Sequence, residues 1–245
     1  EDYSIMDLAA GAGRVGIGLA KKMLADSLVL PLAASTMDIF LVAGWSASAS
    51  KAAAAMLVAN TLYVYLDFSA YCDLAIGAGR AAGRRIPENF DWPLLRSGIR
   101  QFWRNWHITL SQWVMRRVYF PVFLRTRSVS LSMVCCMLII GLWHALNVPW
   151  VLWALHHGLA MAAEARFFPE KARIDRGRLV SAMRYTAGML FIWGWVSLGH
   201  SFTLFASLEA ALRSYVLALV APATFVLPSE LIHGARSLIS AMVRG

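Results

Sequence analysis

One histidine ends an apolar run of the chain that carries no charged residue. His144 lies in the stretch Gly141-Leu-Trp-His-Ala-Leu-Asn147, at the end of residues 129–146. An ionisable side chain at membrane depth is costly and is normally functional. Desolvation favours the neutral imidazole, which can accept a proton. His144 is therefore a candidate base; the alternative is a buried histidine that only bonds a neighbouring helix.

A second histidine lies among arginines. Four side chains at spacings of four, three and four share one face of a single predicted helix: Arg100, Arg104, His107 and Ser111. The adjacent face is apolar and contains Phe102, Trp103, Trp106, Leu110 and Trp113. An interfacial helix would explain the arginines and the aromatic residues, but not the histidine. Guanidinium groups bind phosphate well, so this stripe suits a ligand that carries phosphate groups.

A third polar group is set into an apolar helix. Tyr63, Asp67 and Tyr71 recur every four residues and so share one face, with Asp73 half a turn beyond. Such residues normally face a bundle interior or a wet cavity. The alternative is an acid at a helix end that simply reaches the lipid headgroups.

Other motifs do not carry chemistry. The Gly11–Gly16 and Gly77–Gly83 segments contain dinucleotide-like glycine patterns, but no strand precedes either, so we interpret them as small residues for close helix packing. The three cysteines (Cys72, Cys135 and Cys136) are interpreted as packing residues. The remaining histidines considered, His156, His157 and His233, lack partners at metal-ligand spacing. We expect no metal and no tightly bound cofactor.

The elements that position these residues are predicted to be membrane helices. Hydrophobic residues make up 59% of the 245 and charged residues only 15%, which excludes an ordinary cytosolic enzyme, a disordered chain and a secreted disulfide scaffold. We predict one membrane domain over residues 1–245. Its predicted spans are 27–46, 52–70, 129–146, 149–165 and 180–199. Residues 202–227, with Glu209 and Arg213 four apart, are predicted to lie in the outer interface rather than to span.

Charge predicts the orientation of these spans. Of the net charge of +9, a charge of +8 lies between Arg80 and Arg127, which hold ten arginines and two acids. Because this block lies between predicted spans, it indicates a cytoplasmic segment rather than a nucleic-acid site. Lys21–Lys22 and residues 166–178 are predicted to be cytoplasmic too. Residues 46–51, residues 147–149 and the chain after Gly199 are predicted to be outside.

Five segments together resemble the membrane-bound O-acyltransferases, in the bacterial branch of alginate O-acetylation and teichoic-acid D-alanylation. The matching segments are Tyr65–Gly77, Ile86–Phe90, Phe102–Ser111, Gly141–His144 and Leu152–Gly158, in the family's order. The resemblance implies an all-α fold, a polytopic transmembrane helical bundle with interfacial or re-entrant helices. Family members are longer, so we expect the sequence to be the C-terminal portion of such a protein, without its N-terminal spans.

The resemblance also implies an activity. The family transfers an acyl group, here expected to be acetyl, to a hydroxyl of a polysaccharide or other envelope polymer outside the bacterial cytoplasmic (inner) membrane. The cosubstrate would be acyl-CoA or an acyl-carrier thioester, and the partners other subunits of an acetylation machinery. His144 matches the catalytic histidine, and His107 a second functional histidine on the cytoplasmic side. The expected donor- and substrate-binding residues are Arg100, Arg104, Trp103, Trp106, Asp67, Tyr71 and Asn147.

Two other functions fit parts of the sequence. A non-catalytic membrane subunit could pass acyl groups or polymer while soluble partners do the chemistry. A proton-coupled transporter could use Asp67, His107 and His144 as relay groups. Transporters tend to show helix breaks in corresponding halves of a repeat, and no repeat is visible here.

Overall fold

The computed structural model describes residues 5–168 and 178–222, and this part of the chain is helical without β-strands, which confirms the predicted all-α class. The α-helices are α1 (Ile5–Leu24), α2 (Leu30–Val42), α3 (Ala47–Ala81), α4 (Ile99–Asn105), α5 (Ile108–Val114), α6 (Phe120–Thr126), α7 (Val129–His144), α8 (Val148–Phe167), α9 (Arg178–Gly199), α10 (Ser201–Leu204) and α11 (Leu208–Val220). Short π-helical turns, η1 (Ala25–Val29) and η3 (Met115–Tyr119), join α1 to α2 and α5 to α6; η2 (Pro93–Leu95) is a 3₁₀ turn.

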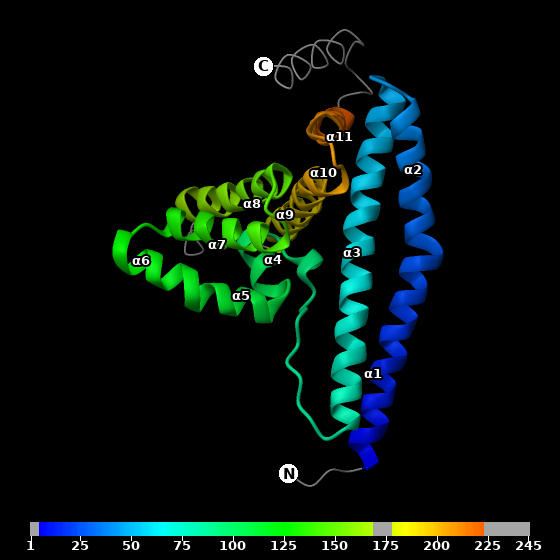
Figure 1. Cartoon of the computed structure of the whole chain (residues 1–245), viewed down its shortest axis with the longest axis vertical. Coiled ribbons are helices and arrows are strands. Elements are labelled where there is room, and N and C mark those ends of the chain that lie inside the picture. Colours follow the sequence, from blue (N-terminus) through cyan, green and yellow to red (C-terminus); the bar gives the residue numbers. More distant parts are fainter. Residues whose placement is uncertain (1–4, 169–177, 223–245) are drawn as a thin grey trace.

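The N-terminal part is a long helical hairpin. α1, η1 and α2 form one helix of 38 residues, Ile5–Val42, which packs along the 35-residue α3 (Figure 1). Both are long and apolar enough to cross a membrane, by length and composition. The predicted span 27–46 is therefore only the second half of a longer helix. Lys21 and Lys22 lie inside α1, not in the loop that the sequence predicted.

Ion pairs explain why a helix continues through these lysines. Asp73 Oδ2 lies 2.6 Å from Lys21 Nζ, and Arg14 Nε donates to Asp73 Oδ1 at 2.6 Å. Lys22 Nζ donates to Asp67 Oδ1 at 2.6 Å. The Asp73 side chain is only 3% exposed. Because each cation of α1 meets a carboxylate, charged residues can lie within the contact between two apolar helices.

The two glycine patterns lie against each other in this hairpin. A Cβ atom on Gly77 would come within 2.6 Å of the Gly11 carbonyl oxygen, and one on Gly11 within 2.6 Å of the Gly77 oxygen. A Cβ on Gly18 would lie 2.9 Å from the Ala70 oxygen. The interpretation as small residues for close helix packing is confirmed for Gly11 and Gly77, whereas a Cβ on Gly13 or Gly16 would meet nothing within 4 Å.

This contact makes a stability prediction. Gly77→Ala should lower the melting temperature in detergent, because overpacking against backbone atoms costs about 1–3 kcal/mol. Gly13→Ala on the same helical pair is the matched control. A Cβ there meets nothing within 4 Å, so alanine should be neutral or stabilising by up to about 1 kcal/mol through its helix propensity. Equal melting temperatures for the two variants would contradict the close contact.

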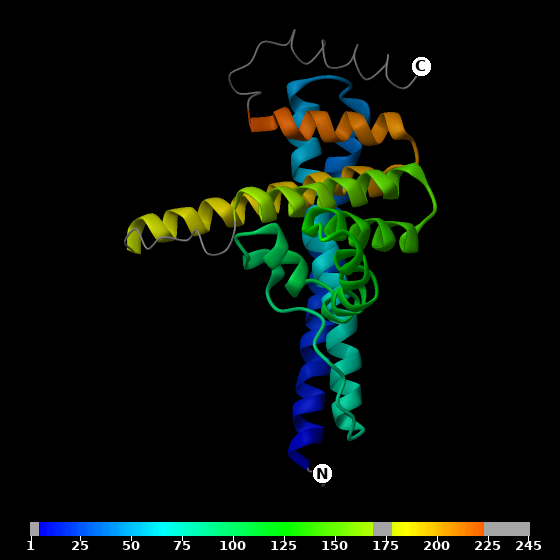
Figure 2. The same cartoon turned by 90° about the vertical axis from the view of Figure 1, so that its left-hand side faces the viewer.

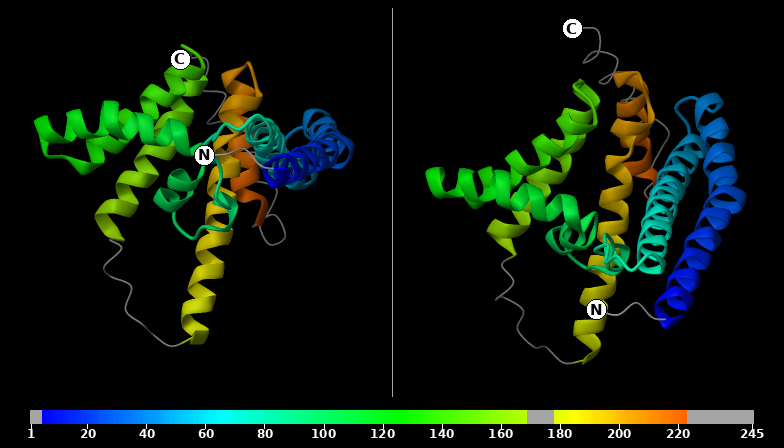
Figure 3. Two further views of the ribbon diagram at one scale, coloured as in Figure 1. Left: turned by 90° about the horizontal axis from the view of Figure 1, so that it is seen from below. Right: turned by 60° about the horizontal axis from the view of Figure 1, so that its bottom comes forward.

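The remaining helices form a second group that runs across the hairpin. α8 and α9 cross the direction of α1 and α3 (Figure 2), and α9 passes between α3 and the α7–α8 pair (Figure 3). A buried hydrogen bond of 2.8 Å between Thr61 Oγ1 and Ser197 Oγ joins α3 to α9. The predicted spans 129–146, 149–165 and 180–199 reappear as α7, α8 and α9. However, the five predicted spans do not lie parallel to one another in one bundle.

The main core lies within this second group. Its largest buried residues come from α4, α7, α8 and α9 and include Phe102, Trp103, Met137, Trp153 and Ile192. Close approach of α7 to α8 requires a small residue, because a Cβ on Gly141 would lie 2.6 Å from the Trp150 carbonyl oxygen. This packing holds the end of α7 against the start of α8.

α11 covers the turn of the hairpin. Its 13 residues are fewer than the roughly 20 that a bilayer needs. The interfacial location of residues 202–227 stays a prediction, and residues 223–227 lie outside the described residues. The sequence suggested that Arg213 pairs with Glu209. In the structure, Arg213 Nη2 donates to the carbonyl oxygens of Phe40 (2.8 Å) and Gly44 (2.6 Å) and so caps the end of α2.

Candidate functional site

His107 lies in a turn between two short helices. The sequence predicted one helix through Arg100, Arg104, His107 and Ser111; that prediction is wrong. α4 ends at Asn105 and α5 begins at Ile108. His107 has a φ of 45°, a left-handed conformation that non-glycine residues rarely adopt. Ser111 Oγ closes the turn by donating to the carbonyl oxygens of Trp103 (2.9 Å) and Trp106 (3.1 Å).

The helix breaks here because a neighbouring segment bonds its backbone. Phe90 pairs with Trp106 as an isolated antiparallel bridge. Asp91 N donates to Asn105 O at 3.1 Å, and Ile108 N donates to the backbone oxygen of Asn89 at 3.0 Å. Backbone groups engaged in this way cannot continue a helical ladder. No periodicity within residues 97–113 could have indicated this, since the partner segment lies earlier in the chain.

The side chain of Asn89 holds the turn from inside. Its Oδ1 accepts from Thr109 N at 3.1 Å and from Thr109 Oγ1 at 2.8 Å. The same oxygen lies 3.3 Å from His107 Nδ1. Its Nδ2 donates to Cys72 Sγ on α3 at 3.6 Å. Asn89 is a residue that the sequence reasoning missed, although it lies within the quoted Ile86–Phe90 segment.

One aromatic ring contacts His107, and others support its turn. Phe68 meets it edge-on with ring centroids 4.9 Å apart. Trp106, a predicted substrate-binding residue, packs between Phe90 (5.0 Å) and Phe102 (5.4 Å) and so supports the turn. Burial lowers the pKa of His107, and the nearby His144 lowers it further. The imidazole is therefore neutral near pH 7.

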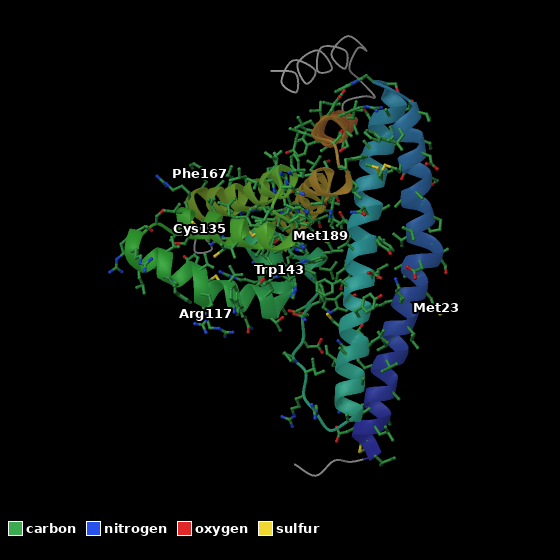
Figure 4. All side chains as sticks on the ribbon, in the orientation of Figure 1. Met23, Arg117, Cys135, Trp143, Phe167 and Met189 are labelled. Carbon is green, nitrogen blue, oxygen red and sulfur yellow. The ribbon has the colours of Figure 1, made fainter. Side chains whose placement is uncertain are left out.

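His144 is the last residue of α7 and is exposed in this chain. Its ring stacks on Trp150 with centroids 4.3 Å apart and planes 9° apart. Trp143, labelled at this end of α7 in Figure 4, meets the ring at 4.8 Å, and Trp153 lies at 6.2 Å. The sequence suggested Leu142 and Trp143 as the apolar lining. The structure confirms the contact with Trp143, but the closest aromatic contact is with Trp150, which the sequence reasoning missed.

Asn147 acts on this site through Trp150. The sequence suggested Asn147 as a substrate-binding residue. In the structure it is the N-cap of α8, and its Oδ1 accepts from Trp150 N at 3.1 Å. Asn147 therefore fixes the start of α8 and, with it, the tryptophan that stacks on His144.

A pocket of about 250 Å³ lies beside the His107 turn. Its polar side comprises Arg100, Arg104 and Ser111, and its apolar side is lined by Trp103, Val114, Met115, Tyr119, Val129, Met133, Cys136, Met137, Ile140 and Met161. Three of the predicted donor-binding residues, Arg100, Trp103 and Arg104, thus line one pocket. A cationic rim over an apolar interior suits a ligand with an anionic part and an apolar part.

The two arginines of this pocket differ. The Arg100 backbone N–H donates to Glu164 Oε2 at 2.8 Å, and Arg100 Nε lies 3.5 Å from the same oxygen. The Arg100 side chain is only 13% exposed, whereas Arg104 is exposed. Arg100 therefore ties α4 to α8, and Arg104 is the better placed of the two to meet an anion from solvent.

Two predicted site residues lie elsewhere. Asp67 pairs with Lys22, and Lys22 Nζ lies 5.7 Å from the Tyr71 ring centroid. Both side chains thus face α1, because positions four apart share one side of a helix. Phe68, the next residue after Asp67, faces His107 instead. Asp67 and Tyr71 contribute to the hairpin rather than to the histidine site.

The other histidines are packed into the core or lie outside the described residues. His156 Nε2 lies 2.9 Å from the Trp195 carbonyl oxygen, and His157 is 1% exposed between Trp103 and Trp153. His233 lies outside the described residues. Within residues 5–168 and 178–222, no group of three or more His, Cys, Asp or Glu side chains is placed to hold a metal ion.

Comparison with known proteins gives one family and several relatives. The model of the MBOAT, membrane-bound O-acyltransferase family, matches residues 4–208. The probable alginate O-acetylase AlgI of Azotobacter vinelandii is 35% identical over 144 residues, which are 57% of this chain and 28% of that protein. The peptidoglycan O-acetyltransferase of Helicobacter pylori is 31% identical over 153 residues (61% and 28%). The teichoic acid D-alanyltransferase of Bacillus subtilis is 28% identical over 111 residues (41% and 28%). The aligned part of this chain thus spans less than a third of each relative.

Proposed function

Since the chain belongs to the membrane-bound O-acyltransferase family, we propose that it transfers an acyl group, acetyl in the first place, from a thioester to a hydroxyl of an envelope polymer. The relatives named for alginate, peptidoglycan and teichoic acid support an acceptor of this class. The site of action would be the bacterial cytoplasmic (inner) membrane, as a multi-pass protein working with other subunits of an acetylation machinery.

One observation carries the proposal. His107, in the turn between α4 and α5, and His144, at the end of α7, come close enough for a charge on His144 to affect the pKa of His107. His107 lies in the turn next to the pocket, and His144 lies exposed at the end of α7. Two imidazoles so placed can serve two substrates that enter from different sides.

The proposed chemistry begins at His144. A hydroxyl is a poor nucleophile until its proton is removed, and a neutral imidazole suits that step. His144 would take the proton from the acceptor hydroxyl as the oxygen attacks the thioester carbonyl. A new C–O ester bond forms, the C–S bond breaks, and the departing thiolate recovers a proton from the imidazolium. Stacking on Trp150 would hold the ring in place during both transfers.

The donor would lie on the side of His107 and the pocket. Arg104 at the rim could bind a donor phosphate, and the methionine-lined interior could hold apolar parts of an acyl-CoA or carrier arm. Further exposed arginines lie on η3 and α6, among them Arg117 on the lower side of this segment (Figure 4). The proposed cytoplasmic location of the Arg80–Arg127 block is supported by the charge pattern.

The transporter alternative has less support. It needs Asp67, His107 and His144 in one relay, but Asp67 is paired with Lys22 at 2.6 Å on the side of α3 that faces α1. The alternative of a non-catalytic subunit predicts that this protein leaves the donor thioester intact and that a partner protein performs the transfer.

Purified protein in lipid nanodiscs should transfer radiolabelled acetyl from acetyl-CoA, or from an acetylated carrier protein, to a polysaccharide acceptor. A panel of alginate, peptidoglycan fragments and teichoic acid would identify the acceptor. Release of free thiol in step with ester formation is the expected result. If the donor stayed intact with every acceptor while a partner protein alone performed the transfer, the subunit alternative would replace this proposal.

A further inference from the structure

The hydrogen bonds of Asn89 determine which end of its side-chain amide faces the His107 turn. Thr109 N is a backbone donor and lies 3.1 Å from the atom assigned as Asn89 Oδ1, so that atom must be an acceptor. The Thr109 hydroxyl donates to the same oxygen at 2.8 Å. On the other side, the amide nitrogen has the Cys72 sulfur as its acceptor at 3.6 Å. A flipped amide would place its N–H against the Thr109 backbone N–H and lose that bond.

This orientation determines the tautomer of His107. His107 Nδ1 lies 3.3 Å from an oxygen that can only accept, so Nδ1 must carry a proton for the bond to form. In the neutral ring, the lone pair then lies on Nε2. The left-handed backbone at His107, with φ 45°, is held by bonds of the same segment, since Ile108 N donates to the Asn89 backbone oxygen at 3.0 Å.

We propose that Asn89 is a positioning residue that holds His107 as the Nδ1–H tautomer and presents Nε2 as its basic atom. The inference rests on the proposed function only for the use of that atom: Nε2 would then accept a proton or a hydrogen bond from the donor side of the reaction. The tautomer itself follows from the bonds around Asn89.

The charged groups around His107 define what a titration would report. His144 is the titratable group whose charge reaches His107. Each carboxylate on the neighbouring elements already has a cationic partner. Asp67 pairs with Lys22, and Asp73 pairs with Arg14 and Lys21. Glu88 pairs with Arg14, and Asp91 pairs with Arg96. A new carboxylate at position 89 would therefore be an added charge next to His107.

The test measures the pH midpoint of His107 ionisation in native membranes. It compares the wild type with Asn89→Asp, Asn89→Leu and the control variant Thr109→Val. Asparagine and aspartate have the same shape, and the carboxylate can accept from His107 Nδ1 and from Thr109. An anion beside the ring favours the imidazolium, so the midpoint of His107 ionisation should move to higher pH by about one unit or more. Thr109→Val removes one bond to Asn89 but leaves the imidazole bond, so its midpoint should stay where the wild type has it.

The readout of ionisation does not need acyl transfer. Diethyl pyrocarbonate modifies an imidazole only in its neutral form, and mass spectrometry of the His107 peptide across pH gives the midpoint. An unchanged midpoint in Asn89→Asp would overturn the inference, whatever the activity. If the midpoint moves but wild-type protein transfers no acyl group, the proposed function fails and the positioning role stands.

Activity supplies the second readout. Asn89→Leu should lower kcat by about 10²-fold, because a misplaced catalytic group costs about that much. Asn89→Asp should retain most of the activity and shift the acidic limb of its pH–rate profile upward. Wild-type kcat in a folded Asn89→Leu protein would overturn the role. If the Asn89→Leu variant does not fold, the midpoint of His107 ionisation in Asn89→Asp still tests the positioning role.

Discussion

Replacement of His144 by glutamine is expected to remove acyl transfer almost completely while the protein still folds and inserts. Loss of a general base costs about 10²–10⁴-fold in rate. The fold should tolerate the change because His144 is exposed at the end of α7 and its closest aromatic contact is the face of Trp150. Initial rates of labelled acyl transfer test the first part, and the melting temperature in detergent tests the second.

His156→Gln is the matched control for this experiment. His156 lies on α8 with its Nε2 2.9 Å from the Trp195 carbonyl oxygen, and a glutamine amide can donate to the same oxygen. We expect its acyl transfer to stay near the wild-type rate. A His144→Gln protein as active as this control would refute both the base assignment and the chemistry built on it.

The second large effect is expected at His107. His107→Asn should lower acyl transfer by about 10²-fold or more if the imidazole assists delivery of the donor, and it should weaken donor binding. Asparagine tolerates the left-handed conformation that φ 45° requires, so the turn between α4 and α5 should survive.

His107→Val separates this chemical effect from the backbone effect. A β-branched residue in a left-handed conformation costs about 1–3 kcal/mol of folding free energy. The valine variant should therefore be less active and should also melt at a lower temperature. Donor affinity measured by competition with a non-hydrolysable thioether analogue completes the test. Unchanged turnover and donor affinity in His107→Asn would show that His107 has no part in the reaction.

The helical fold and several helix bounds could be predicted from the sequence, because apolar runs and turns between them are local signals. The predicted 129–146 corresponds to α7 at Val129–His144, and 149–165 corresponds to α8 at Val148–Phe167. The first span was predicted too short for a physical reason. Lys21 and Lys22 look like a loop when only their own charges are counted, and their partners Asp67 and Asp73 lie on α3.

In the candidate site, too, the features with local sequence signals could be predicted, and those that depend on distant contacts could not. His144, His107 and the lining residues Arg100, Trp103 and Arg104 could be selected by residue type, although the single helix that their spacing predicted is broken at His107. Their supports could not be selected, because they depend on contacts between distant segments. Asn89 reaches His107 only because residues 86–92 fold back along the turn, and Trp150 reaches His144 because α8 packs on α7.

The ion pairs between α1 and α3 also bear on how the chain is made. In a bilayer, an unpaired lysine, arginine or aspartate at the helix centre costs about 2.5–3.5 kcal/mol on translocon scales. During synthesis, Lys21 and Lys22 leave the ribosome long before Asp67 and Asp73, which follow only after α2 is complete. Lys22 can already pair with Asp26 of its own helix, at 3.0 Å, but Lys21 meets its carboxylate, Asp73, only when α3 arrives. We therefore expect biogenesis of this hairpin to be coupled, with the two helices entering the lipid together so that Lys21 and Asp73 are buried as a pair.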